Sequence, residues 1–307
     1  MPARGRTAPV TLEPVPPPEL SRGAPLPPPR GGWALRLRIA SGVLFVPLLV
    51  LLARAGGVAF LVFVMMQVVV GLLEFYRMMR AKGLIPQRTV GVLASVLLLA
   101  SAYRPDRFPR DLIVTGGVLA LLGFALSRPH QRSAENLAAT AFGVVWVGWL
   151  SAHLVLLREL PWRAGTEYAL GASFVLLAFF VTWSCDTGAY LVGRRFGRRP
   201  LWREISPRKT VEGAIGGFLC AVLAAFVARA WFAPYLRWWD AVALGVLVGV
   251  FGQVGDLVES LLKRDARHED SSDIIPGHGG VLDRFDSLYF GAPIVFYYLT
   301  YVIYQAP

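Results

Sequence analysis

Residues 239–262 read WDAVALGVLVGVFGQVGDLVESLL, an apolar run with few polar interruptions. A helix needs about 20 such residues to cross the hydrocarbon core of a membrane. The run is continuously apolar, whereas the strands of a membrane barrel alternate apolar and polar residues. It therefore predicts a membrane-spanning helix. Asp256, well inside the run, is a candidate functional residue because an unpaired charge inside a span is costly.

Similar runs recur along the 307-residue chain, which is 55% hydrophobic and 17% charged. With a mean hydropathy of +0.52, the chain is too apolar for an ordinary soluble protein. We predict an all-α polytopic membrane protein in which residues 34–307 form one helical catalytic domain with about nine transmembrane helices. The predicted spans are residues 37–53, 55–75, 89–103, 112–127, 137–157, 168–193, 211–233, 239–262 and 287–304.

Residues 1–33 differ in composition, because they hold ten of the 22 prolines of the chain. Such a segment buries too little apolar surface to offset its ordering entropy, so it is predicted to be a disordered tail. With the tail in the cytoplasm, 23 of the 31 Lys and Arg residues fall on the cytoplasmic side and eight on the other. The excess of positive charge on the inside predicts a cytoplasmic N-terminus, an outside C-terminus and a multi-pass protein of the inner (plasma) membrane.

A polar segment, residues 260–286, reads SLLKRDARHEDSSDIIPGHGGVLDRFD between the last two runs. Gly279 and Gly280 permit a tight turn that can approach a phosphate closely, and His278 adds a donor. Arg284 can bind a phosphate through two parallel hydrogen bonds. On charge alone, the same segment could be a solvated loop.

Helical spacing places Asp256, Ser260 and Lys263 on one face of the preceding helix. Together with Asp283 and Asp286, this face offers oxygen ligands for Mg²⁺ and a cation for a phosphate. An internal Asp–Lys ion pair that neutralises a packed helix is the alternative explanation of the spacing.

A second basic segment, residues 194–213, reads RRFGRRPLWREISPRKTVEG and contains Lys209. Ser206 or Thr210 could cap the helix that follows and leave amide donors facing an anion. The segment could instead serve only as an inside-positive anchor. Asp186 in the sixth span falls in the same half of the membrane as Asp256, so the polar residues converge on the cytoplasmic side.

The net charge of +11 indicates attraction to anionic lipid and phosphate, and no nucleic-acid-binding module is recognisable, so no nucleic acid is expected as a partner. The signatures of P-loop enzymes, kinases and zinc proteases are absent from the sequence. The remaining pattern favours metal-assisted phosphoryl or nucleotidyl transfer at a membrane surface.

Residues 260–286 resemble the signature of the phosphatidate cytidylyltransferases, which runs S-x-x-K-R, then K-D, then H-G-G-x-x-D-R-x-D. The lysine of the K-D pair is Glu269 here, and likeness extends over residues 180–290, with a weaker match near Glu74. The matching residues are Ser260, Lys263, Arg264, Asp270, His278, Gly279, Gly280, Asp283, Arg284 and Asp286.

The resemblance implies that the enzyme transfers a cytidylyl group from CTP to phosphatidate, giving CDP-diacylglycerol and pyrophosphate at a cytoplasmic-side active site. It suggests Asp256 and Asp283 as Mg²⁺ ligands, with room for a second cation such as K⁺, and a homodimer as the assembly. Alternatives are a related CTP-dependent kinase or cytidylyltransferase acting on another lipid, and an anion transporter. The expected phosphate-neutralising residues are Lys209, Lys263, Arg264 and Arg284, and the expected orienting residues are Asp186, Asp286 and His278.

Overall fold

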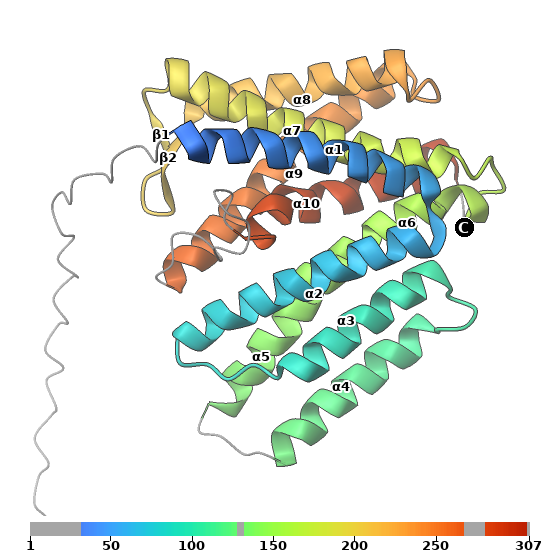
Figure 1. The fold of residues 1–307 in the computed structure, drawn as a ribbon, viewed down its shortest axis with the longest axis vertical. Helices are drawn as coiled ribbons and strands as arrows, with labels where there is room; N and C mark the ends of the chain where they lie inside the picture. The colour runs from blue at the N-terminus through green and yellow to red at the C-terminus, as the bar shows by residue number, and fades with distance from the viewer. Residues whose placement is uncertain (1–31, 128–131, 267–279, 306–307) are drawn as a thin grey trace, which may run out of the picture.

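The structure is a computed structural model that describes residues 32–127, 132–266 and 280–305. The predicted disordered tail, up to residue 31, lies outside the described residues, as do His278 and Gly279. The described chain is almost entirely helical (Figure 1). Its helices are α1 (Gly32–Ala55), α2 (Gly57–Ala81), α3 (Arg88–Tyr103), α4 (Arg110–Ser127), α5 (Ser133–Gly143), α6 (Leu150–Arg163), α7 (Leu170–Phe196), α8 (Val211–Trp231), α9 (Trp238–Asp265) and α10 (Leu282–Tyr298).

Two short π-helical segments continue these helices without a break. The segment η1 (Val144–Trp149) joins α5 to α6, and η2 (Leu299–Ile303) extends α10. Every predicted apolar run coincides with a helix to within a few residues, so the all-α membrane architecture is confirmed. The predicted count of nine spans is not confirmed. Among the described residues, six helices are long and apolar enough to cross a membrane, namely α2, α4, the continuous helix from α5 to α6, α7, α8 and α9.

The helices that follow residue 170 pack in chain order, α7 on α8, α8 on α9 and α9 on α10. Small residues allow α7 and α8 to approach closely, because a Cβ added at Gly217 would lie 2.7 Å from the carbonyl oxygen of Cys185. Helix α4 lies at the opposite edge of the bundle against α3, and none of its described residues is buried (Figure 1). The half of the bundle formed by α7 to α10 therefore contains the described residues of the two polar segments, 194–213 and 260–286.

A β-hairpin between α7 and α8 was not predicted from the sequence. Strand β1 (Pro200–Trp202) pairs antiparallel with β2 (Ser206–Thr210), with Pro200 opposite Thr210 and Trp202 opposite Ser206. Thr210 ends the hairpin and caps α8, since its Oγ1 accepts a hydrogen bond of 3.1 Å from the amide of Gly213. Of the two predicted capping residues, Thr210 is the one that caps the helix.

A buried arginine joins α6 to the end of α1. Arg158 is 1% exposed, and its guanidinium donates to the carbonyl oxygens of Ala53 at 2.6 Å and Arg54 at 3.3 Å. It also donates to the Tyr168 carbonyl at 3.1 Å. The chain turns from α1 into α2 at Gly56, whose φ of 60° favours glycine, and a Cβ there would collide with the guanidinium. Arg158 thus supplies donors to carbonyls that the end of α1 leaves without helical partners.

Arg158→Met is expected to lower the free energy of unfolding by about 2–4 kcal/mol, because one buried and two part-buried carbonyls lose their donors. Thermal unfolding of the purified protein in detergent measures the change. Arg54→Met is the control, since Arg54 is exposed and only its backbone takes part in this contact. Equal melting temperatures for the two variants would contradict this account of Arg158.

Candidate active site

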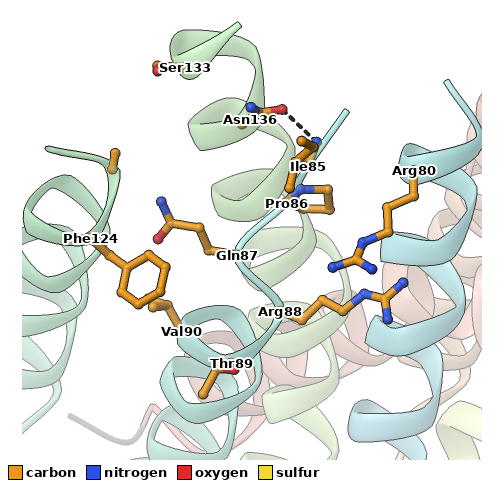
Figure 2. Close-up of a pocket in the computed structure, with 11 residues that line it drawn as sticks. Arg80, Ile85, Pro86, Gln87, Arg88, Thr89, Val90, Phe124, Ser133 and Asn136 are labelled. Atoms are coloured by element: carbon orange, nitrogen blue, oxygen red, sulfur yellow. Dashed lines mark hydrogen bonds between the residues drawn. The ribbon is translucent and has the colours of Figure 1, made fainter. Parts of the chain in front are cut away.

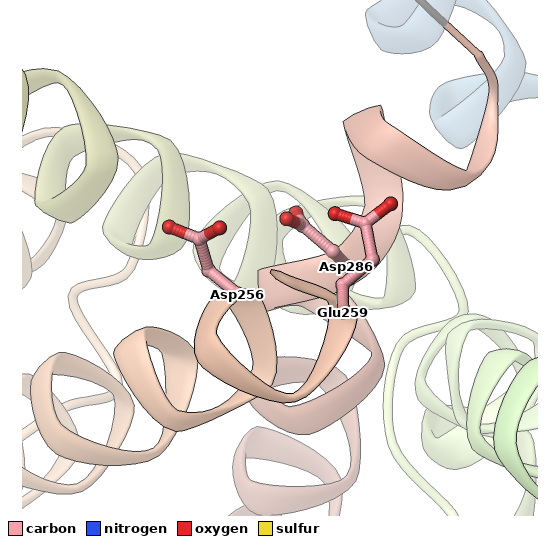
Figure 3. Close-up of side chains that lie close together, drawn as sticks. All are labelled: Asp256, Glu259 and Asp286. Carbon is pink, nitrogen blue, oxygen red and sulfur yellow. The ribbon is translucent and has the colours of Figure 1, made fainter. Parts of the chain in front are cut away.

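Three carboxylates meet where α9 packs against α10. One oxygen from each of Asp256, Glu259 and Asp286 lies within 4.8 Å of the others, and Figure 3 shows the three groups turned to the same side. Glu259 is 1% exposed and Asp286 is 8% exposed. The helices can approach here because residue 255 is a glycine, where a Cβ would lie 2.7 Å from the Asp286 carbonyl. We call Asp256, Glu259 and Asp286 the acidic cluster.

The acidic cluster fits a metal ion. Like charges this close repel one another, and burial adds a desolvation cost, so the arrangement needs a compensating cation or proton. One oxygen of Glu259, Oε1, is buried and has no hydrogen-bond partner in the described part of the chain. Carboxylate oxygens are the ligands that Mg²⁺ and Ca²⁺ prefer. These donors could therefore hold a hard divalent cation.

Two lysines lie against the carboxylates from different elements. Lys209 comes from β2, and its Nζ lies 2.6 Å from Asp256 Oδ2 and 3.5 Å from Ser260 Oγ. Lys263 comes from α9, and its Nζ lies 3.2 Å from Glu259 and 2.7 Å from Asp283. Asp256 therefore pairs with Lys209 of the unpredicted hairpin, while Lys263 pairs with Glu259 on its own helix and with Asp283 of α10.

The start of α10 is held by two carboxylates. The amide of Gly280 donates to Asp283 Oδ2 at 2.7 Å. Glu74 of α2 accepts from the amides of Val281 at 3.1 Å and Leu282 at 2.8 Å. These are helix N-terminal donors without helical partners, and a negative charge also suits this end of the helix dipole.

Glu74 was not proposed as a site residue, although the sequence around it showed a weak family likeness. The residue is fully buried. A glutamate inside an apolar run is the signal that could have found it, by the same rule that selected Asp256.

Glu74→Ala is expected to cost about 1–3 kcal/mol of stability, since the buried amide of Leu282 and the part-buried amide of Val281 lose their acceptor. It should also lower activity, because α10 carries Asp283 and Asp286. Glu74→Gln retains one acceptor oxygen and should be the milder variant. Melting temperature and turnover in the same detergent test both effects, and a Glu74→Ala protein as stable and active as wild type would remove Glu74 from the site.

Asp186 reaches the same region from α7. Its Oδ1 accepts a hydrogen bond of 3.1 Å from Ser287 Oγ, and Asp256 and Asp286 are near enough to repel it. Five carboxylates therefore share this region with the two lysines. The surplus of negative charge among these side chains again favours binding of a cation.

A cavity of about 610 Å³ opens beside these groups. One part of its wall is polar and includes Asp186, Asp283, Arg284 and Asp286. The rest is mainly apolar and comes from α1, α2 and α7, for example Phe63. A cavity with one charged and one apolar wall suits an amphiphile with an anionic headgroup.

The other predicted residues lie around the hairpin or outside the described chain. Arg264 donates from Nε to the carbonyl of Ile205 at 3.2 Å, which ties the end of α9 to the hairpin. Ser206 lies at the start of β2, directly after Ile205, whose carbonyl accepts this hydrogen bond. His278 and Gly279 are outside the described residues, so their predicted roles stay predictions.

Known proteins similar to this chain share one activity in their names. The model of the cytidylyltransferase family matches residues 36–302. The phosphatidate cytidylyltransferase of Synechocystis sp. is 34% identical over 290 residues, which cover 87% of this chain and 97% of the relative. That of Bacillus subtilis is 33% identical over 270 residues, covering 87% and 98%.

A phosphatidate cytidylyltransferase of Staphylococcus aureus is 44% identical over a shorter stretch of 126 residues, covering 41% of this chain and 48% of the relative. The family match covers the helical domain almost from end to end, including the acidic cluster, both lysines and the cavity. The chain therefore belongs to the cytidylyltransferase family.

Proposed function

We propose that this protein transfers the cytidylyl group of CTP to phosphatidate, giving CDP-diacylglycerol and pyrophosphate. The observation that carries the proposal is the cavity whose charged wall, with Asp283 and Arg284, faces an apolar wall from the membrane helices. Phosphatidate has a charged phosphate and apolar acyl chains, so a site that binds it needs a charged wall and an apolar wall together. The names of the relatives over most of the chain support the same substrate pair.

The residues suit the reaction in the following way. An oxygen of the phosphatidate phosphate forms a bond to the α-phosphorus of CTP, and the bond from that phosphorus to the pyrophosphate oxygen breaks. The attacking phosphate is already ionised, so no dedicated general base is needed. Lys209, Lys263, Arg264 and Arg284 are proposed to bind phosphates and neutralise their charge.

We propose Mg²⁺ as the cofactor, with Asp256 and Asp283 as the ligands inferred from the sequence and Glu259 and Asp286 beside them. Mg²⁺ supplies charge neutralisation on the transferring phosphate when it is bound. Lys263 Nζ pairs with both Glu259 and Asp283, so a positive charge already lies against these two carboxylates. We also propose the second cation, such as K⁺, that the resemblance suggests.

The remaining predicted residues would position substrates. Asp186 and Asp286 would orient the lysines or ligands, as would His278. The proposed substrate-binding residues are Asp186, Ser206, Thr210, Ser260, Gly279 and Gly280.

A product assay tests the proposed function. Purified protein receives CTP labelled on the α-phosphorus or the γ-phosphorus, with either phosphatidate or a lipid alcohol. Label from the α-phosphorus should appear in a CDP-lipid with phosphatidate alone, while the γ-label leaves as pyrophosphate. Transfer of the γ-label to a lipid alcohol would identify a lipid kinase, and anion movement into liposomes without any CDP-lipid would identify a transporter.

We propose an inner-membrane location with the hairpin end of the bundle in the cytoplasm, where CTP is present. Arg203→Cys in the hairpin and Asp106→Cys between α3 and α4 replace exposed residues near opposite ends. In a background with Cys185 and Cys220 changed to Ala, an impermeant thiol reagent should reach residue 106 in intact cells. It should reach residue 203 only after the membrane is opened, and the reverse pattern would invert the topology.

We further propose the homodimer that the resemblance implies. Helix α4 is the candidate contact, because it is apolar, has no buried residue in its described length, and has open space beside Gly116 and Gly123. Small residues let membrane helices approach closely. The mass of the protein–detergent complex measures this, and a monomer at all concentrations would contradict it.

A further inference from the structure

A second cavity, of about 400 Å³, lies between the end of α2 and the starts of α3 and α5, with α4 on one side (Figure 2). It is lined by Arg80, Gln87 and Arg88 and by apolar groups that include Ile85 and Phe124. Neither the proposed reaction nor the acidic cluster uses any of these residues. The cavity lies at the hairpin end of the bundle, since Lys82 at the end of α2 pairs with Asp265 at the end of α9.

The basic residues of this cavity have no carboxylate in an ion pair with them in the part of the chain that the structure describes. Arg80 and Arg88 both line it, and the charges of Arg77 and Arg80 act on Arg88. Within the described ranges, none of these three arginines forms an ion pair. The neighbouring basic groups do, as Lys82 pairs with Asp265 and Arg132 with Glu135. Two arginines in one wall, Arg80 and Arg88, give this cavity the charge that suits an anion.

Two buried polar atoms in the wall have no partner among the described residues. They are Nε of Arg88, which is a donor, and Oε1 of Gln87, which is an acceptor. A buried polar atom without a hydrogen bond costs about 1–3 kcal/mol. A ligand that satisfies both atoms carries an acceptor oxygen for the arginine, for which a phosphate oxygen is well suited, and a hydroxyl or similar donor for the glutamine.

The rest of the wall is apolar and partly exposed. Ile85 is 46% exposed and Phe124 is 40% exposed, although both are large hydrophobic residues. They flank the ends of apolar helices, which is the depth at which phospholipid headgroups meet acyl chains. An amphiphile would cover these side chains, whereas a small soluble anion would leave them uncovered.

We propose that this cavity binds an anionic phospholipid whose phosphodiester headgroup carries hydroxyl groups. Arg80 and Arg88 bind the phosphate, a headgroup hydroxyl donates to Gln87, and Ile85 and Phe124 contact the glycerol and the first acyl carbons. The proposal does not depend on the reaction assigned to the acidic cluster.

Native mass spectrometry of the full-length protein in a neutral detergent tests it with phosphatidylglycerol as the probe. The double variant Arg80→Gln, Arg88→Gln should bind this lipid about tenfold or more weakly than wild type, because each basic residue near a membrane surface contributes appreciably to anionic-lipid binding. The matched control is Arg54→Gln, Arg107→Gln, which removes the same charge from exposed residues near the other end. The control should bind like wild type.

Two further measurements, competition by other ligands and the binding of two lipids to a Gln87 variant, identify the chemical class of the ligand. Phosphatidylcholine and sn-glycerol 3-phosphate should compete poorly, because one has no net negative charge and the other has no acyl chains. Gln87→Leu should weaken binding of phosphatidylglycerol several-fold but leave phosphatidylmethanol, an anionic phosphodiester without hydroxyls, unchanged. Gln87→Leu keeps both arginines, so it remains informative if the double variant folds poorly.

Three results would overturn the proposal. These are wild-type affinity in the double variant, equal loss in the control, or full displacement of the lipid by glycerol phosphate, which would indicate a site for soluble anions.

Discussion

Asp286→Asn is expected to reduce turnover by about 10³-fold or more, on the scale of losing a charged group beside the metal of a phosphoryl-transfer site. Asp286 is 8% exposed and shares the acidic cluster with Asp256 and Glu259. The amide has nearly the same shape as the carboxylate, but it carries no charge and binds Mg²⁺ less tightly. Steady-state formation of CDP-lipid at saturating Mg²⁺ measures the loss.

Thermal stability provides a second measurement, because in the absence of metal the substitution should not lower the melting temperature, although it lowers activity. Removing one of three crowded carboxylates relieves repulsion, so the melting temperature in a chelator should equal or exceed that of wild type. The increase in melting temperature that Mg²⁺ produces in wild type should shrink or vanish, since a ligand stabilises only the state that binds it. Asp111→Asn is the control, because its side chain is 96% exposed on α4.

A variant that loses activity but keeps the full Mg²⁺ response would separate Asp286 from the metal. Activity within threefold of wild type would remove it from the site altogether. Asp256→Asn should behave like Asp286→Asn in activity, but it also leaves Lys209 without its carboxylate partner.

The helices were predictable because lipid imposes a strong local constraint. Each run had to be apolar along its length and to satisfy its own backbone, so span positions could be read without knowing what packs beside them. The number of spans was less secure. Helix α3 is shorter than the helices counted as spans, and α10 begins with Asp283, Arg284 and Asp286.

Several of the side chains that meet at the candidate site were singled out from the sequence, but Glu74 and Glu259 were not among the predicted site residues, and the ion pairs were not predicted. Helical spacing placed Asp256, Ser260 and Lys263 on one face of α9. In the structure Lys209 contacts both Asp256 and Ser260, whereas Lys263 pairs with Glu259 and Asp283. The spacing could not show that Lys209 would approach Asp256, because that contact depends on how the hairpin packs against α9. The two residues are 47 positions apart in the sequence. Long-range pairing of this kind follows from packing and not from local pattern.

The role of Glu259 could not be predicted from helical spacing either. The spacing places it next to the predicted face of α9, but its place in the acidic cluster follows from the close approach of α10 at Gly255. Glu74 depends on a contact between α2 and α10 across more than 200 positions of sequence, as its 2.8 Å hydrogen bond from Leu282 shows. Neither role could be derived from periodicity alone.

Arg284→Ala is expected to lower kcat/KM by about 10²-fold, on the scale of removing one donor that stabilises charge in a transition state. Arg284 lines the larger cavity beside Asp283, and it is exposed, so truncating it removes little packing. The melting temperature should therefore change little, in contrast to Arg158→Met. Arg284→Lys keeps the charge but loses the two parallel donors, so it should recover part of the activity.

Whether Arg284→Ala changes KM or kcat reveals whether Arg284 binds the substrate or stabilises the transition state. If it binds the phosphate equally in substrate and transition state, KM for phosphatidate rises and kcat is unchanged. If it stabilises the transferring group, kcat falls, which is the outcome we expect. Kinetics in detergent–phosphatidate mixed micelles separate the two, with Arg107→Ala as an exposed arginine outside the site. Normal turnover by Arg284→Ala would show that the arginine on the charged wall of the cavity does not act on the substrate, and the proposed reaction site would then have to lie elsewhere in the bundle.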